Sequence, residues 1–131
     1  MLYNLALEVL ANAYAPYSNF KVGVAIKSSN SKFYVGCNVE NAAYPQSLCA
    51  ESGAISSMVA AGCNLISEVL VISESDKLIV PCGGCRQKLL EFSNKDTKVH
   101  LASISRVEKT LSINDLLPFS FNNTFLNDLS D

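Results

Sequence analysis

Val69-Leu70-Val71-Ile72-Ser73 is the stretch that decides the fold predicted for this chain. Four consecutive apolar residues are typical of a short strand that is buried on both faces of a sheet. Good helix formers run from Leu48 to Ala61 before this strand, and Gly62 is suited to end that helix. Residues 82–92 follow a proline and indicate a second helix after the strand. A buried strand between two helices favours an α/β architecture.

The remaining elements add four strands and one helix. Residues 2–13 have the spacing of an amphipathic helix, which Pro16 ends. Two β-rich segments flank Ser28-Ser29-Asn30-Ser31 and predict a hairpin, the only antiparallel pair that we expect. The order α-β-β-α-β-α-β-β predicts a three-layer α-β-α sandwich with a mixed five-stranded sheet. The predicted strands are Val22 to Lys27, Phe33 to Val39, Val69 to Ser73, Val99 to Ile104 and Lys109 to Ile113.

Composition is that of a compact globular protein. The chain has 131 residues, of which 49% are hydrophobic and 17% are charged, so a disordered protein is excluded. Ten Lys and Arg against twelve Asp and Glu give a net charge of -2, without the basic excess that binding to nucleic acid requires. We expect a single domain over residues 1–131, with a polar tail from about residue 119. Neither nucleic acid nor membrane is an expected partner.

The cysteine count and the first residues of the chain predict where in the cell the protein is located. Five cysteines are an odd number, which argues against a disulfide framework and for reduced thiols. The chain begins without the basic segment of a secretory signal, and it has no apolar run of about 18 residues. We therefore expect a cytoplasmic protein whose thiols are free for metal binding or catalysis.

Cys82-Gly83-Gly84-Cys85 is a C-x-x-C motif at the predicted start of a helix. Unpaired backbone N–H groups and the helix dipole favour thiolates at that position. On spacing alone, such a pair is a zinc site, a thioredoxin-like redox dithiol or two buried core cysteines. Cys49-Ala50-Glu51 offers a third sulfur and a carboxylate at the predicted start of another helix.

Three thiolates around zinc leave one open position in a tetrahedral site. An open position is typical of catalytic zinc, because it holds a water molecule whose pKa the metal lowers. A nearby glutamate, here Glu51, then has protons to move. A cysteine ligand, a non-ligating glutamate and a P-C-x-x-C pair together match the pattern of the zinc deaminases. The combination therefore favours a catalytic zinc site over the redox and core alternatives.

Between about residues 14 and 118, the chain resembles the small, homotetrameric type of cytidine deaminase. Five segments carry the resemblance, in the same order along the chain. They are Tyr14-Ala15-Pro16-Tyr17-Ser18-x-Phe20-x-Val22-Gly23, Gly36-Cys37-Asn38-Val39-Glu40-Asn41-Ala42-Ala43-Tyr44, Cys49-Ala50-Glu51, Pro81-Cys82-Gly83-x-Cys85-Arg86-Gln87 and Leu116-Leu117-Pro118. The resemblance implies one Zn²⁺ per chain and hydrolysis of cytidine and deoxycytidine to uridine and deoxyuridine, with release of ammonia, in pyrimidine salvage.

The resemblance also implies a role for individual residues. It makes Cys49, Cys82 and Cys85 the zinc ligands and Glu51 the proton shuttle. An amide and a carboxylate two residues apart on a strand share one face and offer a sugar hydroxyl both a donor and an acceptor. The implied contacts are Phe20 with the pyrimidine, Asn38 and Glu40 with the ribose 3′-hydroxyl, the Ala50 N–H with the base carbonyl, and the Val80 C=O with the leaving amino group. Tyr44 lies in a matching segment, where packing is the alternative role.

The end of the chain carries the expectation of self-association. Phe121 follows Leu116-Leu117-Pro118 where the resembling family places an aromatic that enters a neighbouring subunit's active site. We therefore expect a homotetramer with Phe121 as a substrate-site residue. The alternative is a frayed polar tail with a few aromatic residues.

Ser52 departs from the family pattern, because many members carry an arginine there that donates to the zinc thiolates. Three thiolates and Zn²⁺ sum to a charge of -1, so the site needs a compensating positive charge. We expect Arg86 and the two helix N-termini to supply it. Cys37 and Cys63 are expected to be plain core cysteines.

The single histidine, His100, is expected to be structural, since the cysteines already supply the ligands of a catalytic site.

Four rival functions stay open. A deaminase of a modified nucleoside such as blasticidin S would use the same chemistry, as would an RNA- or DNA-editing enzyme. A thiol-redox protein would use Cys82 and Cys85 but leave Cys49-Ala50-Glu51 unexplained, and a non-catalytic zinc module would leave Asn38 and Glu40 unexplained.

Overall fold

The computed structural model describes residues 1–129, so the last two residues of the predicted domain lie outside the described part. It contains a five-stranded sheet with the strand order β2-β1-β3-β4-β5. The elements are α1 (Leu2–Leu10), β1 (Val22–Ser28), β2 (Phe33–Cys37), the 3₁₀ helix η1 (Tyr44–Gln46), α2 (Ala50–Ala60), β3 (Ile66–Ser73), α3 (Gly83–Glu91), β4 (Lys98–Ala102), β5 (Val107–Ser112), α4 (Ile113–Leu116) and α5 (Asn123–Leu129).

The sheet is mixed, as predicted, but the prediction of a single antiparallel pair is wrong. β1 pairs antiparallel with both β2 and β3, and β4 pairs antiparallel with β5. β3 and β4 are the parallel neighbours. α2 connects β2 to β3 as a crossover, so these two strands run in one direction with β1 between them. Because the hairpin reverses the chain, β1 opposes the strands on both of its sides.

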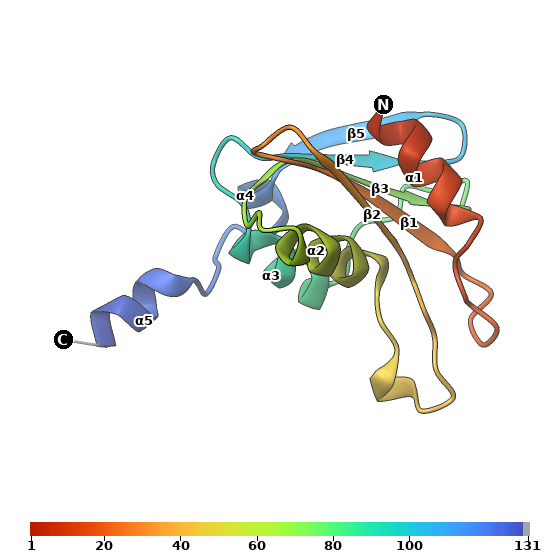
Figure 1. Cartoon of the computed structure of the whole chain (residues 1–131), viewed down its shortest axis with the longest axis horizontal. Coiled ribbons are helices and arrows are strands. Elements are labelled where there is room, and N and C mark those ends of the chain that lie inside the picture. The colour runs from red at the N-terminus through yellow and green to blue at the C-terminus, as the bar shows by residue number, and fades with distance from the viewer. Residues whose placement is uncertain (130–131) are drawn as a thin grey trace.

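Helices cover both faces of the sheet, which confirms the three-layer prediction (Figure 1). On one face, α1 packs through Ala6 and Leu10 against Ala25, Leu70 and Ile72. On the other face, α2 and α3 cover the alternate side chains of the same central strands. This second cluster includes Val24, Ile26, Ala54, Met58, Val69, Val71 and Leu89. From Val69 to Ile72, β3 is apolar because both of its faces are buried there.

Close packing at Gly36 sets the position of α2. A Cβ added to Gly36 would lie 2.4 Å from the backbone N of Ala54 and 2.5 Å from the carbonyl O of Ala50. The first turns of α2 therefore rest directly on the backbone of β2. Cys49 caps this helix and Glu51 lies in its first turn, so the same contact positions both residues.

Several element boundaries differ from those predicted. α1 ends three residues early, β3 begins three residues early, and β4 and β5 each shift by one or two residues toward the N-terminus. β2 ends at Cys37, two residues early. After Cys37, the side-chain Oδ1 of Asn38 accepts the backbone N–H of Val22 at 2.9 Å, which replaces a ladder hydrogen bond. The sequence analysis did not predict η1, α4 or α5.

The tail leaves the sheet after α4, and α5 projects away from the body of the molecule (Figure 1). Phe119 is 99% exposed. The rings of Phe121 and Phe125 stack with their centroids 5.5 Å apart, and both remain largely exposed. Within residues 1–129, no helix combines the length and the apolar character that crossing a membrane requires.

Candidate active site

A cavity of about 430 Å³ opens where the N-termini of α2 and α3 meet the sheet. The start of β1, the loop after β2 and the loop before α3 complete its wall. Both helix N-termini direct unpaired N–H groups and the positive ends of their dipoles toward this region, which favours anionic groups there. Nine of the predicted site residues line the cavity, namely Phe20, Asn38, Glu40, Cys49, Ala50, Glu51, Val80, Cys82 and Cys85.

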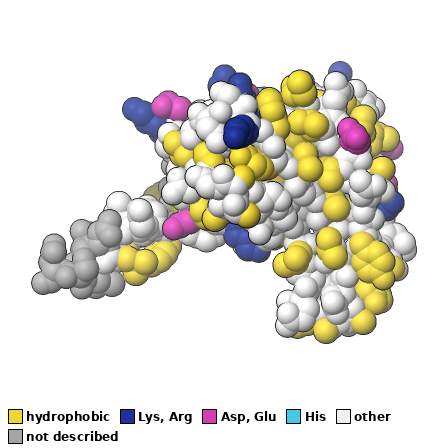
Figure 2. Space-filling model, in the orientation of Figure 1, with side chains coloured by type: hydrophobic (Ala, Val, Ile, Leu, Met, Phe, Trp, Pro, Cys, Tyr) yellow, Lys and Arg dark blue, Asp and Glu magenta, His cyan; other side chains and the backbone are white. Residues whose placement is uncertain are grey.

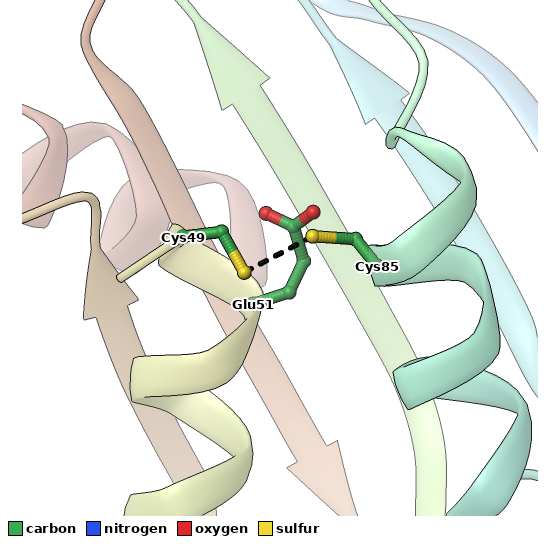
Figure 3. A group of neighbouring side chains, drawn as sticks. All are labelled: Cys49, Glu51 and Cys85. Atoms are coloured by element: carbon green, nitrogen blue, oxygen red, sulfur yellow. Dashed lines mark hydrogen bonds between the residues drawn. The ribbon is translucent and has the colours of Figure 1, made fainter. Parts of the chain in front are cut away.

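Two sulfurs and a carboxyl group lie close together at the N-terminal ends of α2 and α3 (Figure 3). Cys49 is the N-cap residue of α2, Glu51 lies in the first turn of that helix, and Cys85 lies in the first turn of α3. The Cys85 thiol donates to the Cys49 sulfur at 3.0 Å. One ligand atom from each of the three residues lies within 4.8 Å of the others. The two helices therefore deliver a compact donor set from distant parts of the chain.

Burial and hydrogen bonding set the protonation of this cluster. The hydrogen bond from Cys85 lowers the pKa of Cys49 to about 4, and the same bond raises the pKa of Cys85. Glu51 is 4% exposed, and its burial raises the pKa of its carboxyl group above the ordinary value. A carboxyl group with a raised pKa is better suited to hold and release a proton than an ordinary glutamate.

Cys82 lines the same cavity but is not a member of the compact group. It is the exposed N-cap residue of α3, three residues before Cys85. Its sulfur lies 4.0 Å from the place where a Cβ would stand on Gly84, so it lies over the first turn of α3. The predicted ligand triad is therefore represented by two clustered sulfurs and a third at the cavity wall.

A positive charge contacts the cluster where the sequence analysis did not expect it. Lys88 donates to the Ser52 Oγ at 2.9 Å and to the Cys49 Sγ at 3.7 Å. Arg86 is directed elsewhere, because its guanidinium donates to the carbonyl groups of Pro81 and Leu116 at 2.8 Å each. The helical spacing of three residues between Cys85 and Lys88 was the sequence signal that could have identified this lysine.

β2 ends at Cys37, so the prediction that Asn38 and Glu40 lie on a strand is wrong, although both residues line the same cavity. The Asn38 side chain accepts from the Val22 N–H and donates to the Phe20 carbonyl. Glu40 accepts the backbone N–H groups of residues 17 and 18 at 3.0 and 3.1 Å and also the Ser18 hydroxyl. The hydroxyl bond is the main cause that lowers the pKa of Glu40.

Tyr44 and Phe121 lie outside the cavity. Tyr44 is 71% exposed on η1 and makes an edge contact with Tyr17, with ring centroids 5.9 Å apart. It lines a neighbouring pocket that shares Glu40 with the cavity. Figure 2 shows hydrophobic side chains on the lobe that contains η1. The Phe121 carbonyl accepts from Gln87, while its side chain is 58% exposed.

The other cysteines and the histidine lie apart from the cluster. Cys63 is buried in the core, as predicted, whereas Cys37 is only partly buried at the end of β2, so its prediction as a core residue is wrong. His100 makes hydrogen bonds with Thr110 on β5 and Glu68 on β3. These contacts agree with the structural role predicted for His100.

The donor set fits a thiolate-binding metal. Zinc binds sulfur at about 2.3 Å, which spaces two sulfurs of a tetrahedral site by about 3.8 Å. The Cys49 and Cys85 sulfurs, now 3.0 Å apart, need only a small separation to reach that geometry. Thiolates select zinc over magnesium or calcium, and a buried carboxylate beside them serves proton transfer. The fold and the site together define a zinc-dependent enzyme domain.

This chain is similar in sequence and in structure to proteins named cytidine deaminases. Residues 1–101 match the family model described as the cytidine and deoxycytidylate deaminase zinc-binding region. A cytidine deaminase from Mycoplasma genitalium is 43% identical over 114 residues, which cover 86% of this chain and 87% of that protein. One from Halalkalibacterium halodurans is 33% identical over 128 residues, covering 98% and 97%. The crystal structure of cytidine deaminase from Burkholderia pseudomallei matches with a TM-score of 0.86 and 40% identity, covering 92% of this chain and 96% of that one.

The chain therefore belongs to the cytidine and deoxycytidylate deaminase family. The resemblance and the fold class predicted from the sequence are both confirmed. Because the matched region is the family's zinc-binding region and the clustered donors suit zinc, zinc is the metal of this site.

Proposed function

We propose that this protein catalyses the hydrolytic deamination of cytidine and deoxycytidine to uridine and deoxyuridine, with release of ammonia, as a step of pyrimidine salvage. The observation that carries the proposal is the buried carboxyl group of Glu51 beside two thiols at the base of a cavity. Relatives named cytidine deaminases support the substrate class, since they match nearly the whole chain at 33–43% identity.

Cys49, Cys82 and Cys85 are the proposed zinc ligands. The first and third already lie in contact, and the Cys82 side chain joins them by turning from the cavity wall toward the cluster. When bound, zinc supplies a Lewis acid that acidifies a water molecule at its open position. Glu51 stays outside the ligand set and is available for proton transfer.

Glu51 moves the protons of the reaction. It accepts a proton from the water that adds to C4 of the pyrimidine and delivers it to ring N3. It then takes the proton of the new C4 hydroxyl group and transfers it to the amino group, so that the C–N bond breaks, ammonia leaves and the C4 carbonyl forms. The raised pKa of Glu51 suits both steps, because the carboxyl group must be able to hold a proton between them. The N–H of Ala50 and the carbonyl of Val80, both at the cavity wall, orient the base, and Phe20 packs against it.

Asn38 and Glu40 are proposed to bind the ribose 3′-hydroxyl. Their contacts within the chain leave the Asn38 amide with one hydrogen to donate and the Glu40 carboxylate with capacity to accept. The hydrogen bonds from residues 17 and 18 hold the Glu40 carboxylate at the cavity wall. Tyr44 extends this wall from the neighbouring pocket.

The exposed aromatic residues of the tail support a homotetramer. Phe119, Phe121 and Phe125 are each at least half exposed in the single chain, and a neighbouring subunit would cover them. We propose that Phe121 reaches the active site of a neighbour.

We also infer a cytoplasmic location, because the five free cysteines require a reducing compartment. The net charge of -2 supports free nucleosides over nucleic acid as substrates.

One preparation tests the function and its rivals. Metal analysis of the purified protein is expected to give one zinc per chain, and ultraviolet absorbance is expected to show loss of cytidine with matching release of ammonia. A zinc-loaded protein that leaves cytidine and deoxycytidine unchanged would contradict the proposal and favour a zinc module or a deaminase of a modified nucleoside. A metal-free protein that reduces disulfides would favour the thiol-redox function.

A further inference from the structure

Lys88 and Ser52 contact the Cys49 sulfur from outside the cavity. The Lys88 Nζ donates to the Ser52 Oγ at 2.9 Å and to the Cys49 Sγ at 3.7 Å, and the Ser52 Oγ lies 2.9 Å from the same sulfur. The three side chains form a closed triangle of polar contacts. Neither Lys88 nor Ser52 lines the cavity, and both line a separate pocket between α2 and α3. Lys88 and Ser52 therefore contact the metal site from the pocket between α2 and α3 and not from the cavity.

The two helices place these residues by the same spacing. Ser52 lies three residues after Cys49, and Lys88 lies three residues after Cys85. Side chains three residues apart share a helix face, so each partner stands one turn beyond a site cysteine. Because the ammonium group occupies a lone pair of the Ser52 oxygen, the serine hydroxyl hydrogen is free to point at the Cys49 sulfur.

The charges of the site call for a cation at this place. Three thiolates and one divalent zinc sum to -1, and the nearby Glu51 carboxyl adds negative charge whenever it is ionised. The guanidinium group of Arg86 donates to two backbone carbonyl groups and not to the sulfurs of the cluster. Among residues 1–129, Lys88 is the cation with a hydrogen bond to a sulfur of the cluster.

We propose that Lys88, acting with Ser52, is a positioning residue that fixes the Cys49 thiolate and offsets the negative charge of the zinc site. The inference rests on the proposed function for its effect on turnover. A hydrogen bond to a ligand sulfur draws electron density from the metal, and partners of this kind are worth about 10- to 100-fold in activity or metal affinity.

Co²⁺ bound in place of zinc gives a readout that does not depend on turnover. Donation to the Cys49 sulfur stabilises the sulfur electrons and raises the energy of the sulfur-to-cobalt charge-transfer absorption. Lys88→Met is expected to shift this band to longer wavelength, and Ser52→Ala is expected to shift it in the same direction. Lys88→Arg keeps the charge and the donor and is expected to restore the band. Lys95→Met removes an exposed lysine remote from the site and serves as the matched control.

Turnover of cytidine supplies the second readout. The kcat of the zinc-loaded Lys88→Met variant is expected to fall about 10- to 100-fold while KM stays unchanged, because Lys88 lies outside the cavity. Lys88→Arg is expected to recover most of this loss. A Lys88→Met variant that fails to bind Co²⁺, while Lys88→Arg binds it, also supports the proposal.

Two results would overturn the proposal. In the first, the band and the kcat of Lys88→Met equal those of Lys95→Met. In the second, KM rises while kcat and the band stay constant, which would make Lys88 a substrate contact. If the wild-type protein does not turn over cytidine, the proposed function fails, but the cobalt band still decides the role of Lys88.

Discussion

Glu51 carries the proposed proton transfers, and its environment makes a sharp prediction at the scale of one residue. Glu51→Gln keeps the shape of the side chain but replaces the carboxyl group with an amide, which cannot shuttle a proton. We expect kcat for cytidine to fall about 10²- to 10⁴-fold, with the zinc content unchanged. Metal analysis beside an ultraviolet turnover assay checks both outcomes. Loss of zinc together with activity would make Glu51 a ligand, since one of its carboxyl oxygens lies within 4.8 Å of both clustered sulfurs.

The third zinc ligand is a second question at the residue scale. Cys82→Ser is expected to weaken zinc binding by more than the roughly 100-fold that losing an outer partner costs, because a thiolate ligand is removed. Competition with a chelator measures the affinity, and Cys63→Ser, which changes a cysteine in the core, is the control. Unchanged affinity in Cys82→Ser would assign the metal to Cys49, Cys85 and Glu51 instead.

At the scale of the elements, the contact between β2 and α2 positions the first turn of α2, where Cys49 and Glu51 lie. Gly36→Ala places a Cβ 2.4–2.5 Å from backbone atoms of α2, which must move away. We expect the free energy of unfolding to fall by about 1–3 kcal/mol. We also expect kcat to fall, because Cys49 and Glu51 move with the helix. Urea denaturation and the turnover assay measure the two effects.

Gly53 is the matched control for this contact. A Cβ on Gly53 would meet the Cα of Gly36 at 3.5 Å, an ordinary van der Waals contact, and Gly53 lies inside α2. Gly53→Ala is therefore expected to stabilise the protein by up to about 1 kcal/mol through helix propensity. Equal effects of the two substitutions would show that α2 does not rest on Gly36.

Three strands meet at His100, and this contact predicts a dependence of stability on pH. The Nε2 of His100 lies 3.0 Å from the Glu68 Oε1 on β3, and its Nδ1 lies 2.8 Å from the Thr110 Oγ1 on β5. The hydrogen bond with His100 lowers the pKa of Glu68 below its ordinary value of 4.5, and Lys27 and Lys98 add to this effect. A carboxyl group whose pKa is lower in the folded state stabilises the fold above its unfolded pKa. That contribution is lost as the pH falls through the folded pKa.

Glu68→Gln is therefore expected to lower the free energy of unfolding by up to about 1 kcal/mol at neutral pH. The difference from wild type is expected to shrink as the pH falls below 4.5. Urea denaturation across this range measures both values, and Glu74→Gln, outside the contact with His100, controls for the change in net charge. A difference that is constant with pH would show that the Glu68 carboxylate does not stabilise the fold.

At the scale of the whole molecule, the tail connects assembly with activity. Phe121→Ala is expected to weaken the proposed tetramer and to lower kcat, because its exposed ring is proposed to reach a neighbouring active site. Sedimentation velocity and the turnover assay measure the two effects. Phe33→Ala removes a partly exposed aromatic ring from β2 and is the control. A wild-type protein that sediments as a monomer at micromolar concentration would contradict the tetramer.

The sequence by itself determined the order of the five strands and of α1, α2 and α3, and it identified the cysteine and glutamate residues suited to zinc chemistry. Apolar periodicity, Gly and Pro signals and the spacing of C-x-x-C are local properties, so they are legible without the fold. The directions of the strands could not be predicted from the sequence, because they depend on which strand lies between β2 and β3 in the assembled sheet.

Only the tertiary structure decided which side chains meet. It brought Cys49 and Cys85 to 3.0 Å although 36 residues separate them, and it ended β2 before Asn38. It also directed Arg86 to backbone carbonyl groups and placed Lys88 on the thiol cluster. The direction of a long side chain depends on the partners that packing leaves within reach, and those partners come from distant parts of the chain.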